Sequence, residues 1–217
     1  MAFAGGMTVF PGGSVDSGDH QEIRAWTGPP PVAWAARLGC DHELAAALVQ
    51  AAVRETFEEC GVLLAGPGRV PAGARQDLIA HRVTLGDVLA KAGLTLRADL
   101  LRAWSRWITP EDSPKRYDTA FFVALVPDGQ AADAHTTEAV EAAWWHPVQA
   151  LECWRRREIA LMLPTVRTLE EIGEHADAQA VLAAADARTI RPTRPQVQRT
   201  GDEAAVLLPG HPGLGVP

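Results

Sequence analysis

The sequence has few cysteines, no long apolar run and no excess of basic residues, and each absence excludes a class of protein. Cys40, Cys60 and Cys153 stand singly with no CxxC pair, which argues against a zinc or disulfide framework and fits a reducing compartment. No window approaches the roughly 18 apolar residues of a membrane span, and the first ten residues lack a basic n-region. A formal net charge of -7 disfavours a nucleic-acid partner, because phosphate backbones attract basic surfaces. We therefore expect a cytoplasmic protein that is neither exported nor inserted into a membrane.

What remains is the composition of an ordinary folded protein. The 217 residues are 47% hydrophobic and 22% charged, which matches globular domains rather than fibrous or disordered chains. This length fits one domain with its own core, which we place at residues 1–188. Prolines and glycines are frequent in residues 189–217, for which we predict an extended, poorly packed tail.

Local signals predict two helices with defined ends. Residues 43–60 are alanine-rich and free of proline and glycine, and Gly61 stands where a left-handed cap ends a helix. Residues 84–92 open with a threonine cap that has an aspartate three positions later. Further helices are predicted at residues 148–158, 164–175 and 177–188.

Apolar runs predict strands among these helices. Met7 to Phe10 is typical of a short strand, and nearly every residue from Tyr117 to Val126 is apolar, as in a strand buried on both faces. Val140 to Pro147 is a further candidate strand. The triple proline at 29–31 marks residues 20–42 as an inserted segment. This mixture of strands and helices favours an α/β class with a mixed sheet in an αβα sandwich.

The stretch RETFEECG, residues 54–61, gathers three carboxylates on one side of the predicted helix. At about 100° per residue, Glu55, Glu58 and Glu59 fall within an arc of roughly 100°. Glu55 and Glu59 repel each other at four-residue spacing near the negative end of the helix dipole, whereas a solvated face normally interleaves lysine. A solvated face is the alternative, but a divalent cation would relieve both costs.

Mg²⁺ and Mn²⁺ are the cations that such a set of oxygens favours. Hard ions prefer carboxylate and carbonyl ligands, and an exposed carbonyl at Gly12 could complete the set formed by the three glutamates. Arg54 is spaced to pair with Glu58 and hold its orientation. Leu44 and Leu48 lie on the carboxylate side one turn earlier, so we expect residues 20–42 to cover that end of the helix.

Two separate stretches together resemble the Nudix box, whose usual form is Gx5Ex7REUxEExGU. The first is GGSVDSGD, residues 12–19, in which Asp19 stands where a glutamate is expected. The second matches at Arg54, Glu55, Glu58, Glu59, Gly61 and Val62. Residues 20 to 53 separate the halves, 34 residues instead of seven, which is similar to the branch of the superfamily that includes peroxisomal coenzyme A diphosphatases. The motif WITPEDSPKRYDTAFFVA, residues 107–124, also looks like that branch.

The resemblance implies a Nudix fold and a metal-dependent hydrolase that cleaves the diphosphate bond of a nucleoside diphosphate conjugate, with coenzyme A or an acyl-CoA as the first substrate to consider. By family position, Glu55 and Glu59 would be the main metal ligands, Glu58 would bind or orient further metal, and Arg54 would orient the carboxylates. The general base varies within the superfamily. Glu55 is one candidate, and Glu138 or Glu141 is the other.

The resemblance also bears on two ambiguous segments. Residues 98–108, ADLLRAWSRWI, have apolar residues at helical spacing, but the resemblance makes the part before TPE a strand, which we adopt. Family members usually carry one or two strands before the segment that corresponds to residues 2–13. In this chain Met1 stands directly before that segment. Either the chain start is assigned too late or the sheet lacks a strand, and we expect the first.

Several other residues have both a functional and a structural interpretation. Lys115 and Arg116 are candidates for binding substrate phosphates, and solvated cations at a strand start are the alternative. Trp144 or Trp145 could stack on an adenine ring, but we expect one to face the core and the other to pack under a helix. Competing functions for the whole chain are a Nudix-like module that senses a nucleotide without cleaving it and a hydrolase of RNA ends or caps.

Overall fold

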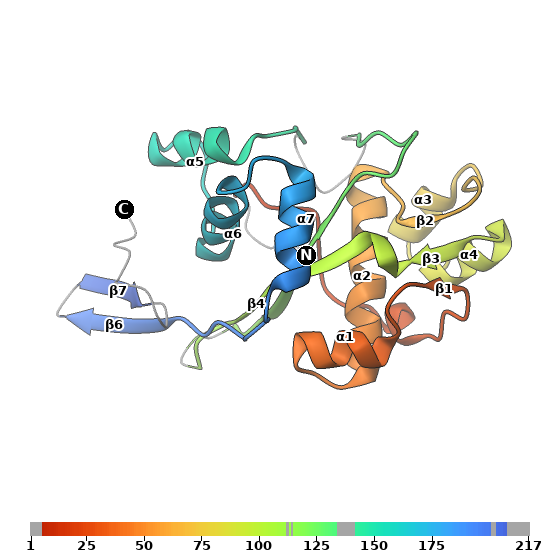
Figure 1. Ribbon diagram of the computed structural model, residues 1–217, viewed down its shortest axis with the longest axis horizontal. Coiled ribbons are helices and arrows are strands. Elements are labelled where there is room, and N and C mark those ends of the chain that lie inside the picture. Colours follow the sequence, from red (N-terminus) through yellow and green to blue (C-terminus); the bar gives the residue numbers. More distant parts are fainter. Residues whose placement is uncertain (1–5, 112, 114, 134–141, 201–202, 208–217) are drawn as a thin grey trace.

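The computed structural model describes residues 6–111, 113, 115–133, 142–200 and 203–207, with side chains as far as residue 196 (Figure 1). The helices in this part of the chain are α1 (Pro31–Leu38), α2 (His42–Cys60), α3 (Ala74–Ile79), α4 (Leu85–Ala92), α5 (Pro147–Arg155), α6 (Leu163–Gly173) and α7 (Ala178–Ala187), with 3-10 turns η1 (Ser17–His20) and η2 (Ala98–Leu100). The strands are β1 (Trp26–Thr27), β2 (Ala65–Gly66), β3 (Thr95–Arg97), β4 (Leu101–Ile108), β5 (Asp118–Ala124), β6 (Gln196–Thr200) and β7 (Glu203–Leu207).

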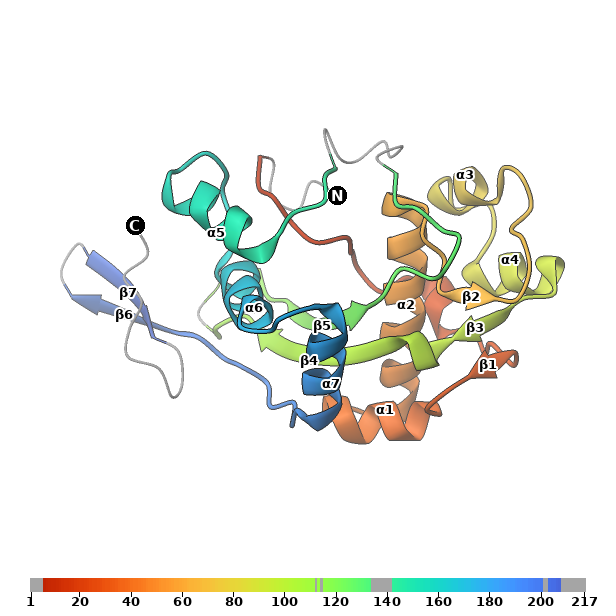
Figure 2. The ribbon, with the colours of Figure 1, turned by 45° about the horizontal axis from the view of Figure 1, so that its top comes forward.

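The strands pair in both directions. β3 lies between β1, which is parallel to it, and β2, which is antiparallel. β4 and β5 form an antiparallel pair, and β6 and β7 form a separate antiparallel pair. β3 leads through η2 directly into β4, so that the two follow one another across the middle of the molecule (Figure 2). The predicted α/β class with a mixed sheet is confirmed.

Helices cover both faces of the β4–β5 pair. On one face, Leu101 and Ala103 share the main hydrophobic core with Val49 and Val53 of α2. On the other face, Arg188, which follows α7, stacks its guanidinium 4.1 Å from the ring centre of Trp104, and α7 contacts both strands. The arrangement is the predicted αβα sandwich.

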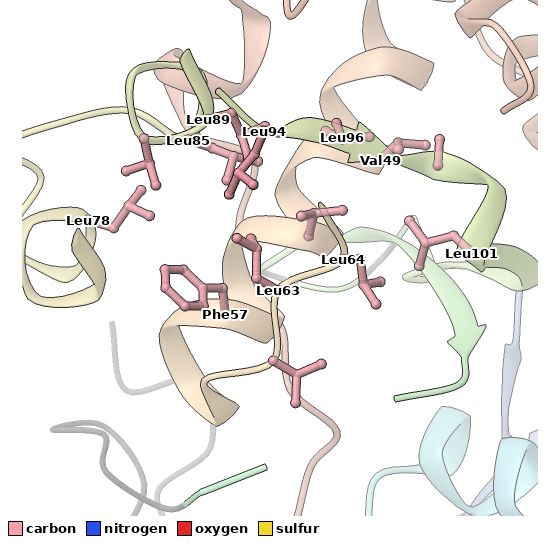
Figure 3. Close-up of a cluster of buried hydrophobic side chains, with 14 of the residues drawn as sticks. Val49, Phe57, Leu63, Leu64, Leu78, Leu85, Leu89, Leu94, Leu96 and Leu101 are labelled. Atoms are coloured by element: carbon pink, nitrogen blue, oxygen red, sulfur yellow. The ribbon is translucent and has the colours of Figure 1, made fainter. Parts of the chain in front are cut away.

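Helix α2 has the ends that its sequence predicts. Asp41 caps the first turn by accepting a hydrogen bond from the Leu44 amide at 2.8 Å. Gly61 ends the helix in the left-handed region with φ +73°, and its amide donates to the Phe57 carbonyl. Phe57 lies in the hydrophobic core with the leucines Leu63 and Leu64 (Figure 3). One face of α2 is thereby fixed, and the opposite face carries the glutamates.

The inserted segment forms a helix that the sequence did not predict. The prolines do not interrupt it, because Pro31 occupies the first helical turn, where a missing amide costs nothing. Trp34 and Leu38 of α1 are buried against α2. The inserted segment therefore packs against α2, and that it covers Leu44 and Leu48 stays a prediction. The C-terminus of α1 is held by the guanidinium of Arg106, which donates from Nη1 to the Leu38 and Gly39 carbonyls at 2.7 and 2.9 Å.

Residues 101–108 form the strand that we adopted, and a β-bulge explains their helical spacing. The register between β4 and β5 shifts between Ala103 and Ser105, which leaves Trp104 as the extra residue. Ala103 and Trp104 are consecutive in sequence but both fully buried, on opposite faces of the sheet. A strand with one inserted residue no longer alternates with period two, so its apolar pattern imitates a helix.

Three strand predictions need correction. Residues 7–10 make only one isolated bridge, Met7 to Ala160, instead of a regular strand. Residues 140–141 of the candidate strand lie outside the described residues, residues 142–146 are not in a strand, and Pro147 begins α5 with His146 as its cap. β5 is partly buried rather than buried on both faces, since every residue of Asp118–Ala124 is half-buried or exposed.

The two adjacent tryptophans and the tail also differ from expectation. Trp144 is 76% exposed and Trp145 is 42% exposed, so neither is a core residue. Thr193 forms a parallel bridge with Trp107, and Ile190 packs against the main core, so the start of the tail is attached to the domain. The division into a domain at 1–188 and a tail at 189–217 stays a prediction. None of the described helices is long and apolar enough to cross a membrane.

Candidate functional site

Arg54 is the centre of a buried network of charges on α2. Its Nε and Nη2 atoms donate to the two carboxylate oxygens of Asp19, at 3.0 and 2.9 Å. Its Nη1 donates to Glu55 at 2.8 Å and to Glu58 at 3.2 Å, and Nη2 also donates to the Ser14 carbonyl at 2.9 Å. The predicted pair between Arg54 and Glu58 is present. Burial lowers the pKa of Arg54, but the carboxylates around it raise that pKa far above its usual value.

Asp19 is the principal partner of Arg54, although sequence reasoning gave it no role. Its side chain is 1% exposed, and its Oδ2 atom also accepts a hydrogen bond from the Asp16 amide at 2.8 Å. That second bond is half of a capping box that opens η1. The signal for this role was in the sequence, since Asp19 occupies the acidic position of the first half-motif.

Gly13 lies directly against the carboxylate of Glu55. A Cβ atom at position 13 would stand 2.3 Å from Glu55 Oε1, so only glycine permits this approach. Burial raises the pKa of Glu55, and the charge and hydrogen bond of Arg54 offset that rise only in part. A desolvated carboxylate with a raised pKa is a suitable proton acceptor near neutral pH.

Glu58 holds a buried oxygen that has no hydrogen-bond partner in the described part of the chain. Its Oε2 atom accepts from Arg54, but its Oε1 atom is buried and has no hydrogen-bond partner among the described residues. Burial raises the pKa of Glu58, Arg54 opposes the rise, and the neighbouring charge of Glu55 adds to it. An unsatisfied buried carboxylate oxygen costs free energy unless a cation or a donor reaches it.

Glu59 also contacts the glycine loop formed by Gly12 and Gly13. The Gly12 amide donates to Glu59 Oε2 at 3.0 Å, so it is the N–H of Gly12 rather than its carbonyl that contacts the glutamates here. The loop 12–13 therefore lies over the acidic face of α2, as the sequence predicted, and contacts two of its three carboxylates. That Gly12 supplies a metal ligand stays a prediction.

The carboxylates face Arg54 and the glycine loop instead of one common point. Among the described residues, no three His, Cys, Asp or Glu side chains are close enough to hold a metal ion. The donor set nevertheless fits a hard divalent cation, because Glu55, Glu58 and Glu59 offer carboxylate oxygens from consecutive turns and Glu58 Oε1 has no other partner there.

A cavity of about 180 Å³ adjoins this network. It is lined by Asp16, Asp19, Arg54, Glu58, His81 and Thr84, among others. His81 has φ +51°, which is uncommon for a residue with a side chain, and its Nδ1 atom lies 3.4 Å from Asp16 Oδ2. The sequence gave no signal for His81, because it approaches the site from the loop between α3 and α4.

Comparison with known proteins identifies the arrangement. The family model described as the NUDT19 Nudix domain matches residues 36–172, more than half of the chain. The chain belongs to the Nudix superfamily. It is 31% identical to nudix hydrolase 7 of Caenorhabditis elegans over 78% of this chain and 51% of that protein. It is 28% identical to the human acyl-coenzyme A diphosphatase NUDT19 over 94% of this chain and 56% of that protein.

A solved structure agrees with this Nudix assignment. The crystal structure of a NUDIX hydrolase from Alicyclobacillus acidocaldarius is similar with a TM-score of 0.72 and 26% identity, over 88% of this chain and 86% of that one. The predicted superfamily and fold are confirmed. The chain spans about half the length of the curated relatives that it matches.

The remaining predicted residues of the Nudix site are not brought into the network. Lys115 and Arg116 precede β5 and are exposed, which leaves their role in phosphate binding a prediction. Glu138 and Glu141, the alternative general bases, lie outside the described residues. Cys60 follows the box glutamates, and burial raises the pKa of its thiol, which keeps it protonated beside Glu59.

Proposed function

We propose that this Nudix chain is a metal-dependent hydrolase that cleaves the diphosphate bond of a nucleoside diphosphate conjugate. The observation that carries the proposal is the network around Arg54. One buried arginine holds Asp19, Glu55 and Glu58, while the glycine loop holds Glu59, so both halves of the interrupted box meet at one place. A module that had lost catalysis would have no need to retain all three glutamates in this arrangement.

The chain's own residues supply positioning and proton transfer in this proposal. Arg54 restrains Glu55 and Glu58 through hydrogen bonds, so these side chains have less freedom to lose when ligands bind. Glu55, whose pKa burial raises, is our candidate to accept the proton of an attacking water. Glu55, Glu58 and Glu59 would hold Mg²⁺ or Mn²⁺, which supplies positive charge to the phosphate oxygens when bound.

The relatives indicate which conjugate to test first. Three of the similar proteins, from human, frog and chicken, are named acyl-coenzyme A diphosphatases, and their identity to this chain is 27 to 28%. A small-molecule CoA or acyl-CoA substrate is therefore our proposal for this chain. The acidic balance of the chain, with a formal net charge of -7, makes an RNA substrate the weaker candidate.

Product analysis on a substrate panel tests the proposal. The purified protein is incubated with CoA, acyl-CoAs, NADH, NDP-sugars and dinucleoside polyphosphates, with Mg²⁺ or Mn²⁺, and products are separated by chromatography. We expect hydrolysis of a CoA species into two phosphate-bearing halves, and a loss of at least about 100-fold in Glu59→Gln. Glu43→Gln, an exposed glutamate in the first turn of the same helix, is the matched control and keeps full activity.

Two results would contradict the proposal. Activity that Glu59→Gln leaves unchanged would remove Glu59 from the reaction. A wild type that binds CoA or a nucleotide but hydrolyses nothing in the panel would favour the sensing module instead.

A further inference from the structure

The C-terminal end of α2 carries the acidic cluster and has no basic residue of its own. Its last turn contains Glu58 and Glu59 and no cation, although the negative end of a helix dipole is stabilised by positive charge. The last carbonyls of a helix also lack partners within it. The end of α2 therefore needs both a cation and donors from elsewhere in the chain.

Arg75 of α3 supplies that cation. Its Nε atom donates to the backbone carbonyl of Glu58 at 3.0 Å, and its Nη1 atom donates to Asp133 Oδ1 at 2.6 Å. The amide of Asp133 in turn donates to the Cys60 carbonyl at 2.9 Å. The Arg75 side chain is 11% exposed and that of Asp133 is 39% exposed, so solvent screens their ion pair in part. The hydrogen bond to the Glu58 carbonyl, by contrast, starts from a largely buried guanidinium. Two carbonyls of the last turn are thereby held from outside the helix.

Gly61 makes room for this contact. A Cβ atom there would stand 2.9 Å from Asp133 Oδ2 and 3.1 Å from Arg75 Nη1. Its φ of +73° already favours glycine, so the residue serves the helix cap and the ion pair at the same position. The box glycine, the arginine and the aspartate therefore form one unit around the end of the catalytic helix.

A second set of tertiary hydrogen bonds holds residues 130–133 but does not involve α2. The amide group of Gln130 exchanges two hydrogen bonds with the backbone of Leu63, both at 2.8 Å. Replacing Gln130 should loosen residues 130–133, while the Glu58 carbonyl keeps its hydrogen bond from Arg75. Gln130 is therefore a matched control for Arg75.

We propose that Arg75 is a positioning residue for Glu58 and Glu59, acting through the Glu58 carbonyl and aided by Asp133. The inference rests on the proposed function, because it assigns these glutamates to metal binding. Arg75 touches neither glutamate side chain in the described contacts. It fixes the backbone turn from which both side chains project, and a displacement of that turn would change where their oxygens point.

The test compares Arg75→Met, Arg75→Lys, Asp133→Ala and Gln130→Ala with the wild type. Steady-state hydrolysis of CoA gives kcat and KM, calorimetric titration with Mn²⁺ in the absence of substrate gives metal affinity, and thermal unfolding gives stability. We expect Arg75→Met to lower both kcat and Mn²⁺ affinity by about 10- to 100-fold with KM within about 2-fold, as for residues that support metal ligands. Gln130→Ala should lose about as much thermal stability as Arg75→Met does. Its kcat and its Mn²⁺ affinity should stay within about 2-fold of the wild-type values.

The two further variants refine this outcome. Arg75→Lys keeps the charge but cannot donate to the Glu58 carbonyl and Asp133 in the same planar geometry, so it should recover part of the loss. Asp133→Ala should show a smaller loss of the same kind. If Arg75→Met does not fold, these two variants carry the comparison against Gln130→Ala.

The failures of the two proposals can be told apart. An active wild type whose Arg75 variants keep kcat and Mn²⁺ affinity, or lose no more than Gln130→Ala does, overturns the positioning role alone. A wild type that binds Mn²⁺ but hydrolyses nothing removes the proposed function, and the affinities still decide the role of Arg75. A wild type that binds no Mn²⁺ overturns both.

Discussion

The guanidinium of Arg54 and the carboxylate of Asp19 form a two-pronged ion pair across the inserted segment, with Nε and Nη2 at 3.0 and 2.9 Å from the two oxygens. The two residues are 35 positions apart, and both are almost fully buried. This pair joins the halves of the interrupted box. It also explains how an insertion can be accommodated, because only its two ends must meet at Arg54.

Asp19→Glu, which restores the usual residue of the box, should destabilise this protein. The side chain of Asp19 also closes a capping box with the Asp16 amide, and one extra methylene would displace its carboxylate from that amide or from Arg54. A buried polar group that loses its hydrogen bond in this way costs about 1 to 3 kcal/mol, and urea unfolding would measure it. Asp19→Ala should cost more, about 3 kcal/mol, because it leaves the buried Arg54 charge without its main partner. Equal stability of Asp19→Glu and wild type would contradict this interpretation.

Gly13→Ala should lower the rate of hydrolysis by about 100-fold with little loss of stability. The new Cβ would stand 2.3 Å from Glu55 Oε1, so either the loop or the glutamate must move. Displacement of a catalytic group by about 1 Å can cost roughly 100-fold in rate. Gly86→Ala in α4 is the control, because its Cβ meets only ordinary contacts at 3.6 and 3.7 Å. We expect that variant to keep its rate and to gain about 0.5 to 1 kcal/mol of stability. Comparable rates for the two variants would refute the close approach.

Glu58→Gln should separate the stability of the metal-free protein from the stabilisation by metal. Without metal, the substitution removes a buried charge, one oxygen of which is unpartnered in the described structure, so the free energy of unfolding should not fall. With Mn²⁺ at about 100 times its Kd, the wild type should gain about 2.7 kcal/mol, and the variant should gain much less. Calorimetric unfolding with and without Mn²⁺, followed by EDTA, measures both effects. An equal rise in Tm for the two proteins would exclude Glu58 from the metal site.

The sequence predicted most accurately the features that local contacts determine. The ends of α2 and α4 follow from Gly61 and from the threonine cap at Thr84, whose partners lie within three or four residues. Helix α1 was missed because prolines usually break helices, and only the position of Pro31 in the first turn reverses that rule. The strand β4 was recognised from the family pattern alone, since its bulge gives the apolar residues a helical spacing.

The residues of the candidate site were likewise predicted most accurately where they lie close together in the sequence. Glu55, Glu58, Glu59 and Arg54 were found because one helix carries all four. Arg75 and His81 approach from other elements, and nothing in their own surroundings in the sequence distinguishes them from surface residues. Only the tertiary contacts of Arg75 with the Glu58 carbonyl, and of His81 with Asp16, reveal them.

The cap of α4 should make a small part of the stability depend on pH. Hydrogen bonds from the backbone amide and the hydroxyl of Thr84 lower the pKa of Asp87 below its ordinary value. A lowered pKa in the folded state stabilises the protein above the unfolded pKa of about 3.9, and this contribution is lost as the pH falls through the folded pKa. Asp87→Ala should therefore cost about 0.5 kcal/mol at pH 7, a figure reduced for solvent exposure, and less as the pH falls through the folded pKa. A cost that did not change with pH would point to packing instead of charge.

The guanidinium of Arg106 should prove essential for docking the inserted helix. It donates to Asp118 of β5 from Nε and Nη2 at 2.7 and 2.5 Å, and its Nη1 holds the last carbonyls of α1. Arg106→Lys keeps the charge but loses the planar set of donors, so we expect a loss of about 2 to 3 kcal/mol in urea unfolding and faster proteolysis within residues 20–42. Arg156→Ala, which removes an exposed pair with Glu158, should leave the unfolding midpoint unchanged. If Arg106→Lys unfolds and resists protease as the wild type does, the inserted helix is held by its apolar contacts with α2 alone.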